Sequence, residues 1–185
     1  MTQEDPLRDR AEIQDCLCRY ARGVDRGDWS LVRATYHPDA YDQHGDFAGD
    51  IDGLLAWLEQ RFAGVDNSMH FLGNCLIEFA GANHAFAETY FTSRRLREPT
   101  TAEARALGLS PADRICREAW GRYADHFERR AGQWRVARRL VVLETSHLSV
   151  ALGGKRGASG SWGSRNGADS IYACRAAVFA AAAGH

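Results

Sequence analysis

The sequence predicts an α+β fold in which three N-terminal helices pack on a strongly curved sheet. Three observations support this class. Apolar residues recur at helical spacing in the first third of the chain, the period changes to two after Gly64, and loops containing glycine separate the later strands. Helices followed by antiparallel strands are typical of domains whose helices cover one face of a sheet. The concave face of such a sheet is a natural place for a pocket.

The first predicted helix begins at Asp9 and ends with the glycines at positions 23 and 27. Its apolar stripe consists of Ile13, Leu17, Tyr20 and Val24. This spacing places the four side chains on one helix face, which is the face expected to meet the sheet. Asp28 is then an N-cap for a second helix, which is expected to end at His37-Pro38-Asp39 because proline disfavours helix in the residue before it.

A third helix follows Asp50 and ends before Gly64. Its buried side is expected to carry Leu54, Leu55, Trp57, Leu58 and Phe62. The segment between the second and third helices, Tyr41 to Gly49, predicts a short strand or a turn. These helices together form the layer that covers the sheet.

Two hairpins follow the helices. The first pairs His70–Phe79 with His84–Thr92, and the second pairs Ile115–Arg129 with Gln133–Leu148. Each pair is joined by a three-residue loop that contains glycine, and the second pair is rich in Trp, Tyr, Phe and Val, which favour strands. The polar segment Arg97–Arg114 between the hairpins is predicted to be an insert with about one helical turn.

The composition shifts after Val150. Residues 153–167 contain six glycines, which predicts a loop or tail, and Ile171–Ala183 regains helical character with many alanines. We therefore expect one domain over residues 1–150 and a Gly-rich C-terminal arm over residues 151–185. This arm is expected to pack on its own domain, cover the mouth of the pocket or reach a neighbouring subunit.

Composition and charge exclude several classes of protein. The 185 residues include 23 Lys and Arg against 24 Asp and Glu, and this net charge of −1 leaves no electrostatic footprint for nucleic acid or an anionic membrane. The polar N-terminus lacks the apolar core of a signal peptide and no run of 18 apolar residues occurs, so we expect a cytoplasmic protein. Five cysteines without metal or redox spacing fit reduced thiols in that compartment.

The first candidate site combines a carboxylate, an imidazole, a phenol and a guanidinium, which are Asp25, His70, Tyr20 and Arg139. A carboxylate beside an imidazole fixes the tautomer of the ring and stabilises the imidazolium that forms when the ring accepts a proton. In this interpretation His70 is a general base and Asp25 orients it. Tyr20 would donate a hydrogen bond to a leaving oxygen, and Arg139 would stabilise an oxyanion or a leaving anion.

Each of these residues also has a structural interpretation. A histidine in a strand is often only packed or exposed, and a tyrosine on an apolar stripe is often part of the core. Asp25 precedes Arg26-Gly27, and aspartate is common in turns of this kind. Arg139 belongs to a run of arginines that fits a solvated strand face. The residues alone therefore leave both interpretations open.

Metal binding and nucleophilic catalysis are weaker hypotheses. His37 and His44 lie seven residues apart among aspartates, but an exposed polar loop explains this segment better than a cation site. No zinc motif occurs among the seven histidines, so no metal site is expected. Ser146 and His147 are neighbours in a predicted strand, so their side chains point to opposite faces and cannot form a dyad.

Several segments of the chain resemble SnoaL-like proteins of the nuclear transport factor 2-like superfamily. They are RAEIQD (10–15), YARGVDRGDW (20–29), YHPDA (36–40), MHF (69–71) with Asn74, and FERRAGQWRV (127–136). The similarity extends over residues 7–148 and leaves the C-terminal arm outside. Within the superfamily the chain is most similar to the branch that includes lindane dehydrochlorinase, bile acid 7α-dehydratase and scytalone dehydratase.

This resemblance implies a cone-shaped α+β barrel whose antiparallel or mixed sheet encloses a hydrophobic pocket. The aspartate and the histidine of the family's dyad fall on Asp25 and His70. The arginine that follows the last hairpin falls on Arg139, and the tyrosine of the bile acid enzyme falls on Tyr20. The dehydrochlorinase has a lysine where this chain has Tyr20, which argues against a substrate that loses halide.

The resemblance implies a cofactor-independent lyase for a hydrophobic aromatic or polycyclic small molecule, acting by β-elimination or by retro-aldol loss of a small aldehyde. One alternative is an isomerase or cyclase of a steroid or polyketide. Another is a non-catalytic binding protein or an accessory subunit like the β subunits of ring-hydroxylating dioxygenases. The resemblance also implies a homotrimer or homodimer. Further residues expected to line the pocket are Tyr41, His44, Asn74, Tyr90 and His147.

Overall fold

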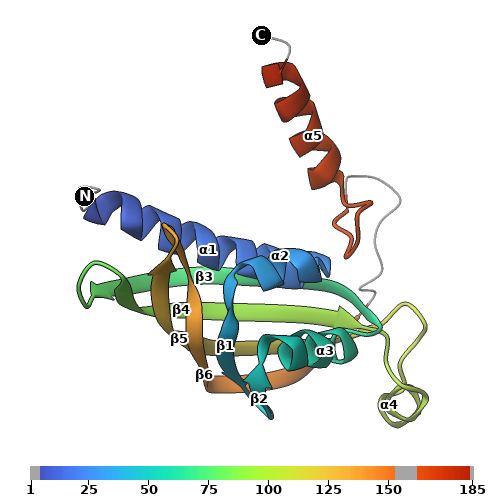
Figure 1. Cartoon of the computed structure of the whole chain (residues 1–185). Helices are drawn as coiled ribbons and strands as arrows, with labels where there is room; N and C mark the ends of the chain where they lie inside the picture. Colours follow the sequence, from blue (N-terminus) through green and yellow to red (C-terminus); the bar gives the residue numbers. More distant parts are fainter. Residues whose placement is uncertain (1–4, 153–161, 184–185) are drawn as a thin grey trace.

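One six-stranded mixed sheet curves around the N-terminal helices (Figure 1). The computed structural model describes residues 5–152 and 162–183. In chain order the elements are α1 (Pro6–Arg26), α2 (Trp29–Ala34), β1 (Tyr36–His44), β2 (Phe47–Asp50), α3 (Ile51–Arg61), β3 (Val65–Phe79), β4 (His84–Arg97), α4 (Thr101–Leu107), β5 (Arg114–Arg130), β6 (Gln133–Ala151) and α5 (Ser170–Ala183). The strand order is β2-β1-β6-β5-β4-β3, with β1 and β6 parallel and the other described neighbours antiparallel. The predicted α+β class is confirmed, but the sheet is open rather than closed into a barrel.

Helix α1 begins and ends where its sequence provides caps. The Asp5 side chain accepts hydrogen bonds from the backbone N–H groups of Leu7 and Arg8 at 3.2 Å each, so the helix begins before the predicted Asp9. Gly27, with a φ of 66°, takes the left-handed conformation that ends the helix. The predicted apolar stripe is confirmed, because its four side chains are at most 2% exposed.

The second helix is shorter than predicted. Helix α2 ends at Ala34, and Tyr36 already belongs to β1, whereas the sequence predicted helix as far as His37-Pro38-Asp39. Strand β1 pairs with both β2 and β6, and these backbone hydrogen bonds decide the conformation of the segment. Pro38 is tolerated because the pairing with β6 is interrupted between Tyr36 and Tyr41, where a missing N–H breaks no ladder bond.

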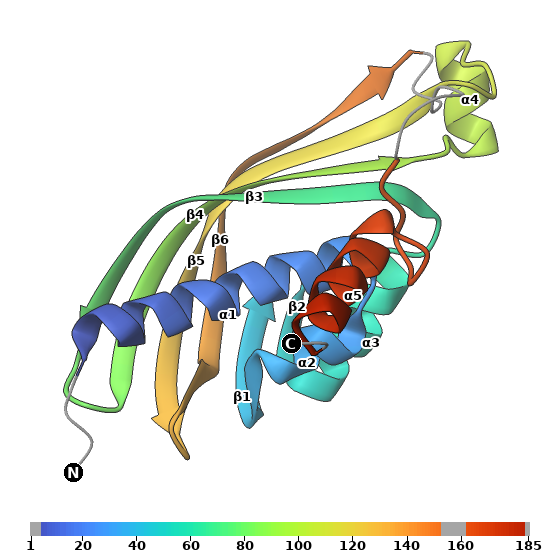
Figure 2. The same ribbon diagram turned by 90° about the horizontal axis from the view of Figure 1, so that it is seen from above.

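The two long hairpins are confirmed and extend beyond their predicted ends. The register between β5 and β6 shifts between Trp120 and Gly121, where β6 has one extra residue, and such a bulge bends the strand that carries it. A Cβ atom at Gly121 would lie 2.4 Å from the carbonyl oxygen of Val142, so glycine is required for the strands to approach this closely. Figure 2 shows the resulting curvature, with α1 lying across the concave side of the sheet.

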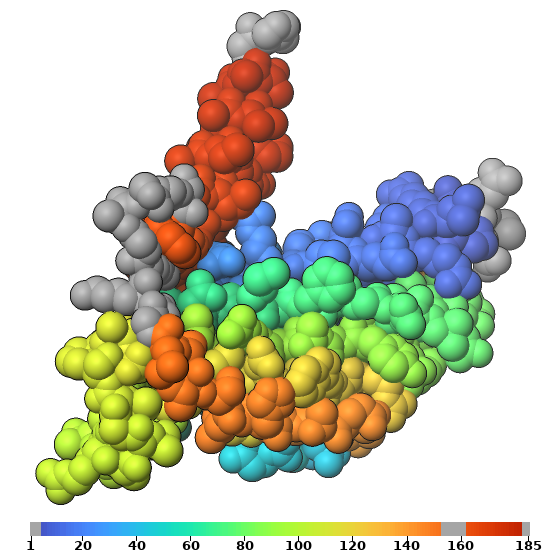
Figure 3. Space-filling model, turned by 180° about the vertical axis from the view of Figure 1, so that it is seen from behind, coloured from blue at the N-terminus to red at the C-terminus, as the bar shows by residue number. Residues whose placement is uncertain are grey.

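The two faces of the sheet differ in what covers them. The core fills the space between the concave face and the helices, and its largest fully buried apolar and aromatic side chains include Tyr20, Tyr36, Leu54, Tyr123 and Phe127. On the outer face, the strands β3 to β6 lie open in the space-filling view (Figure 3). This face carries exposed apolar side chains, including Met69, Phe71, Leu76, Tyr90 and Trp120.

The C-terminal arm consists of an anchored segment and a projecting helix. In the segment 162–169, Arg165 donates hydrogen bonds to the backbone carbonyls of Val24 and Asp25 at 3.0 and 3.2 Å. The predicted terminal helix is confirmed as α5, which points away from the sheet (Figure 1). Much of the predicted Gly-rich stretch, residues 153–161, lies outside the described residues. None of the described helices combines the length and the apolar character that a membrane crossing requires.

Candidate active site

Asp25 and His70 form a hydrogen-bonded pair at the wall of a pocket. The Nδ1 atom of His70 lies 2.7 Å from Oδ1 of Asp25. The same carboxylate accepts two further hydrogen bonds at 2.8 Å, from the backbone N–H of His70 and from the hydroxyl of Ser68. Both side chains are largely buried, with 8% of Asp25 and 9% of His70 exposed. The juxtaposition expected for these two residues is therefore present in the fold.

Local structure explains why the two residues meet. Asp25 lies in the last turn of α1, and the helix ends two residues later at Gly27, so its carboxylate is directed at β3 rather than at the next helical turn. Strand β3 alternates between faces, which places Ser68 and His70 on the same inner side. A main-chain bond and two side-chain bonds then fix the carboxylate to this strand.

These hydrogen bonds decide the charge state of the pair. Burial alone would raise the pKa of Asp25, but hydrogen bonds from His70 and Ser68 and the charge of His70 outweigh it, so the pKa lies below its usual range. An ionised Asp25 only accepts hydrogen bonds, so Nδ1 of His70 carries the proton that it donates. The nitrogen left to take a proton from a bound molecule is Nε2.

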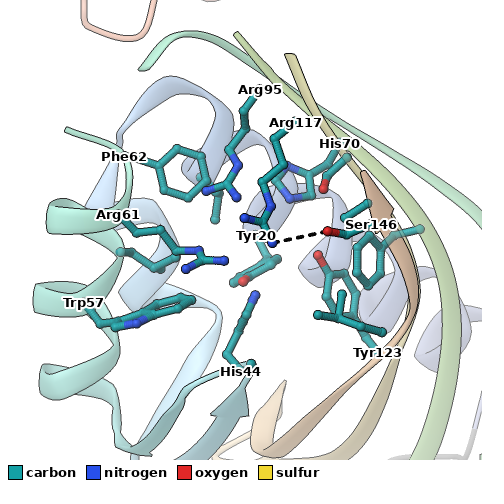
Figure 4. Close-up of a pocket in the computed structure, with 17 residues that line it drawn as sticks. Tyr20, His44, Trp57, Arg61, Phe62, His70, Arg95, Arg117, Tyr123 and Ser146 are labelled. Atoms are coloured by element: carbon teal, nitrogen blue, oxygen red, sulfur yellow. Dashed lines mark hydrogen bonds between the residues drawn. The ribbon is translucent and has the colours of Figure 1, made fainter. Parts of the chain in front are cut away.

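The pocket beside His70 is formed by α1, α3 and the inner faces of the strands (Figure 4). Its labelled residues are Tyr20, His44, Trp57, Arg61, Phe62, His70, Arg95, Arg117, Tyr123 and Ser146. Aromatic rings and three guanidinium groups both line this space, and two of the guanidinium groups lie against rings. The pocket therefore fits a small molecule that has both an apolar part and a polar part.

Tyr20 lines the pocket as expected, whereas Arg139 lies behind it. Arg139 is fully buried and forms a bidentate ion pair with Asp125, with both distances at 2.7 Å. Its guanidinium is stacked between the rings of Tyr20 and Tyr123, each 4.2 Å away. Arg139 is not among the residues that line the pocket, because the two rings cover it. The expected direct contact between Arg139 and a leaving group is therefore wrong, and its position fits support of the tyrosines.

Burial determines what Tyr20 can do. Only 1% of the residue is exposed, and this burial raises the pKa of its hydroxyl well above the usual range even though Arg139 lowers it. The hydroxyl is therefore neutral near pH 7 and available as a hydrogen-bond donor to a bound oxygen. The donor role expected for Tyr20 stays a prediction.

His44 lines the pocket across from His70 (Figure 4). Its ring lies 5.2 Å from the ring of Trp57, and its Nδ1 atom lies 3.7 Å from the buried carboxylate of Asp42. Burial lowers the pKa of His44 and outweighs the opposite effect of Asp42. The expectation that His44 faces the pocket is therefore supported, and the ring is uncharged there near pH 7.

Stability should fall as the pH falls, and His44 should account for part of that loss. In the unfolded chain His44 takes up a proton near about pH 6.5, while in the folded protein its lowered pKa delays protonation. The unfolded state then binds more protons than the folded state, so the free energy of unfolding decreases in this range. Urea unfolding at about pH 7.5 and about pH 5.5 measures the loss, which should be smaller in His44→Gln than in the wild type.

Gln60→Asn is the control for this experiment, because Gln60 is exposed on α3, does not line the pocket and carries no titratable group. The control should lose as much stability between the two pH values as the wild type. The same loss in His44→Gln as in the wild type would contradict the assignment of His44 as a buried, neutral group.

Four of the expected lining residues lie outside the pocket. They are Tyr41, Asn74, Tyr90 and His147. Tyr41 is 39% exposed and stacks with Arg138, and Asn74 is exposed on β3. Tyr90 and His147 point to the outer face, because the inner positions of β4 and β6 are taken by their neighbours Phe91 and Ser146.

The sequence analysis missed the contribution of α3 and of the far ends of β4 and β5. Trp57 and Arg61 reach the pocket from one face of α3, where the spacing of four residues brings them together. Arg95 and Arg117 come from alternating positions on β4 and β5. The sequence spacing places Phe91 and Arg95 on the same face of β4. It does not indicate which ends of the strands lie next to α3.

The structure changes the interpretation of the segment between His37 and His44. It is a strand rather than a polar loop, and His37 is buried with Nε2 2.9 Å from the carbonyl oxygen of Glu128. In the described part of the chain, one group of three metal-type ligands lies close together, at His84, His126 and Glu128. This group lies near the loop ends of β4 and β5 and does not line the pocket.

Comparison with known proteins gives one family match. The SnoaL-like domain matches residues 5–140. An uncharacterized protein of Mycobacterium tuberculosis is 27% identical over 146 residues, covering 72% of this chain and 84% of its own length.

Solved structures with the same fold include two from species of Novosphingobium. One is a putative scytalone dehydratase from Novosphingobium aromaticivorans, with 17% identity, a TM-score of 0.64 and coverage of 82% of this chain and 96% of its own. The other is the LinA-type3 hexachlorocyclohexane dehydrochlorinase of Novosphingobium barchaimii, with 18% identity, a TM-score of 0.64 and coverage of 77% and 91%. At this level of identity the likeness establishes the fold.

Proposed function

Because the chain belongs to the SnoaL-like domain family, we propose that its pocket is the active site of a small-molecule lyase. The observation that carries this proposal is the Asp25–His70 hydrogen bond of 2.7 Å at a pocket lined by aromatic rings. Neighbours in fold that are described as a dehydratase and a dehydrochlorinase support an enzyme of the lyase or isomerase type. Proton transfer by an imidazole needs no cofactor, so we propose a cofactor-independent reaction.

In the proposed reaction His70 acts as the general base. Its Nε2 atom removes a proton from a carbon of the substrate, and the electron pair of that C–H bond becomes a new C=C double bond. A hydroxyl on the adjacent carbon leaves with its bonding electrons and takes the proton from Nε2 of His70, so that water is released and the neutral imidazole is restored. Asp25 stabilises the imidazolium, and the neutral Tyr20 donates a hydrogen bond to the departing oxygen.

The experiment uses a panel of aryl ketones and their β-hydroxy derivatives. The aldol of benzaldehyde and acetone is informative, because elimination yields a conjugated enone and retro-aldol cleavage yields benzaldehyde, which differ in ultraviolet absorbance. Ketones without a leaving group report the base alone, since proton abstraction in D₂O exchanges the hydrogen beside the carbonyl for deuterium. We expect enzyme-dependent elimination and exchange that are lost in His70→Gln.

Each alternative gives a different result in this assay. Release of benzaldehyde without enone would assign retro-aldol cleavage, and exchange without elimination would favour an isomerase or cyclase. Ligand binding with neither exchange nor elimination across the panel would contradict the lyase proposal and favour a binding protein or accessory subunit.

We also propose that the outer sheet face mediates homotrimer or homodimer formation. A shallow depression on this face is lined largely by apolar and aromatic groups, including Phe71, Tyr90 and Trp120, and Phe71 is 64% exposed. Light scattering should give a multiple of the 20.5 kDa chain mass, and Phe71→Glu should shift the mass towards the monomer. Leu107→Glu, at an exposed site on α4, is the control that should leave the assembly intact. A monomeric wild type would contradict the proposal.

A further inference from the structure

Three arginines from three different elements line the pocket together with His70. Arg61 comes from α3, Arg95 from β4 and Arg117 from β5, and Figure 4 shows their guanidinium groups directed towards one space. The same three residues line an adjoining cavity, whose other walls include Val65 and Leu148. The three arginines therefore lie between two neighbouring hollows and line both of them.

Aromatic rings hold two of these arginines in place. The guanidinium of Arg61 lies 4.7 Å from the ring centre of Trp57, and that of Arg95 lies 5.0 Å from the ring centre of Phe62. Arg117 donates a hydrogen bond to the hydroxyl of Ser146 at 3.2 Å. These contacts orient the side chains but supply no negative charge.

The positive charge of this cluster has little compensation. In the described part of the chain, no carboxylate lies within ion-pair distance of Arg95 or Arg117. Arg61 has a carboxylate only at 3.7 Å, on the exposed side chain of Asp46. The cluster therefore retains capacity for at least one anionic group.

Other arginines of the same strands are paired. Arg97, two residues after Arg95, meets Glu103 at 2.7 Å, and Arg122 of β5 meets Glu88 at 2.5 Å. The pocket cluster is thus an exception on strands where neighbouring arginines have carboxylate partners. The lack of carboxylate partners is therefore confined to the arginines at the pocket and does not extend to the other arginines named on these strands.

Holding these charges together has an electrostatic cost. Burial, followed by the charges of Arg61, Arg117 and Arg165, lowers the pKa of Arg95 to about 10. The guanidinium nevertheless stays protonated near pH 7. Like charges gathered in a half-buried site destabilise the empty pocket and attract an anion, which would remove the repulsion.

We propose that the substrate carries an anionic oxygen group, a carboxylate or a phosphate, which binds Arg61, Arg95 and Arg117. This inference deepens the proposed function and rests on it for the identity of the bound molecule as substrate. The planar guanidinium groups match the oxygens of either anion through paired N–H donors. The apolar part of the molecule would lie against Trp57 and Phe62, within the same pocket as His70. The expected hydrophobic substrate is thereby narrowed to an amphipathic one.

Binding of inert probes tests the inference without any turnover. Isothermal titration calorimetry would compare naphthoate, naphthyl phosphate and the neutral naphthamide, using the whole chain with His70→Gln so that no reaction occurs. At least one anionic probe should bind about tenfold or more tightly than the amide, and added salt should weaken that preference. The stronger of the two anions identifies the group.

Two charge-removing variants and one matched control complete the design. The preference for the anion should fall to near unity in the double variant Arg95→Gln, Arg117→Gln. Arg94→Gln is the control, because Arg94 is the neighbour of Arg95 on β4 but pairs with Glu118 and does not line the pocket. Removing like charge should leave the melting temperature of Arg95→Gln equal to or above that of the parent, which shows that the variant is folded.

Equal affinity for anionic and neutral probes would overturn the inference, as would an anion preference that survives in the folded double variant. Its failure differs from failure of the proposed function. Elimination or deuterium exchange on neutral ketones, without any preference for anionic probes, would support the lyase proposal and contradict the anion site. The opposite result is anion binding that depends on the arginines, with no turnover of any ketone in the panel or of a carboxylate-bearing β-hydroxy ketone. It would support the anion site and contradict the lyase proposal.

Discussion

Replacing His70 with glutamine should lower the rate of elimination by about 10²–10⁴-fold, because glutamine fills much of the same space but cannot accept the substrate proton. Deuterium exchange into a ketone should fall in parallel, since both reactions begin with the same proton transfer. The measurement is kcat for enone formation, together with the exchange rate followed by NMR. A folded His70→Gln protein with wild-type rates would remove His70 from the mechanism.

Asp25→Asn tests the negative charge of the carboxylate separately from the shape of the side chain. The asparagine keeps the shape of the side chain but cannot balance the charge of the imidazolium, and its amide can donate to Nδ1, which would leave the proton on Nε2. We expect a loss of activity that approaches that of His70→Gln. Asp15→Asn is the matched control, because Asp15 is an exposed aspartate on the same helix and does not line the pocket, and its activity should equal that of the wild type.

Arg139→Met should destabilise the fold by about 3–5 kcal/mol, because it leaves the Asp125 carboxylate buried and unpaired. Removing a partner from a buried ion pair costs more than the pair itself contributes, since no water can replace the lost guanidinium. Urea denaturation gives the free energy of unfolding. The exposed neighbour variant Arg138→Met should change it by less than about 1 kcal/mol.

The pH dependence of this variant has a defined sign. Without the guanidinium, burial raises the pKa of the Asp125 carboxyl, so the folded variant takes up a proton that the unfolded chain still lacks. Its deficit in stability relative to the wild type should therefore shrink as the pH falls towards about 5 and grow again as the pH rises. A pH-independent loss, or a loss below about 1 kcal/mol, would contradict a fully buried ion pair.

Local sequence patterns predicted the parts of the site that depend on one element at a time. The phase of the apolar stripe placed Tyr20 on the inner side of α1, and the glycine after Asp25 marked the end of the helix. The segments shared with SnoaL-like proteins then connected Asp25 to His70. Their contact depends on how α1 lies across β3, which no local pattern specifies, and here the resemblance supplied the missing information.

Local patterns could not predict how deeply a side chain is buried, or which side chains from different elements meet. Alternation along β6 places Arg139 on the inner side, but it cannot reveal that the rings of Tyr20 and Tyr123 cover the guanidinium. The arginine cluster depends on the relative positions of α3, β4 and β5, so Arg95 and Arg117 were not recognised. Tyr90 was expected to line the pocket, but Phe91 holds the inner position of β4, and successive residues of a strand point to opposite faces.

The carboxylate of Asp25 accepts both the ring N–H and the main-chain N–H of His70, so the imidazole has lost most of its rotational freedom before any ligand arrives. Several residues of the pocket wall, including Trp57, Arg95 and Arg117, belong to other elements and have no hydrogen bond to this pair. Substitutions at these wall residues should therefore change which molecule binds without reorienting the His70 imidazole. Because of this separation, proteins of common descent can differ in the molecules that they bind while the His70 imidazole keeps the same orientation.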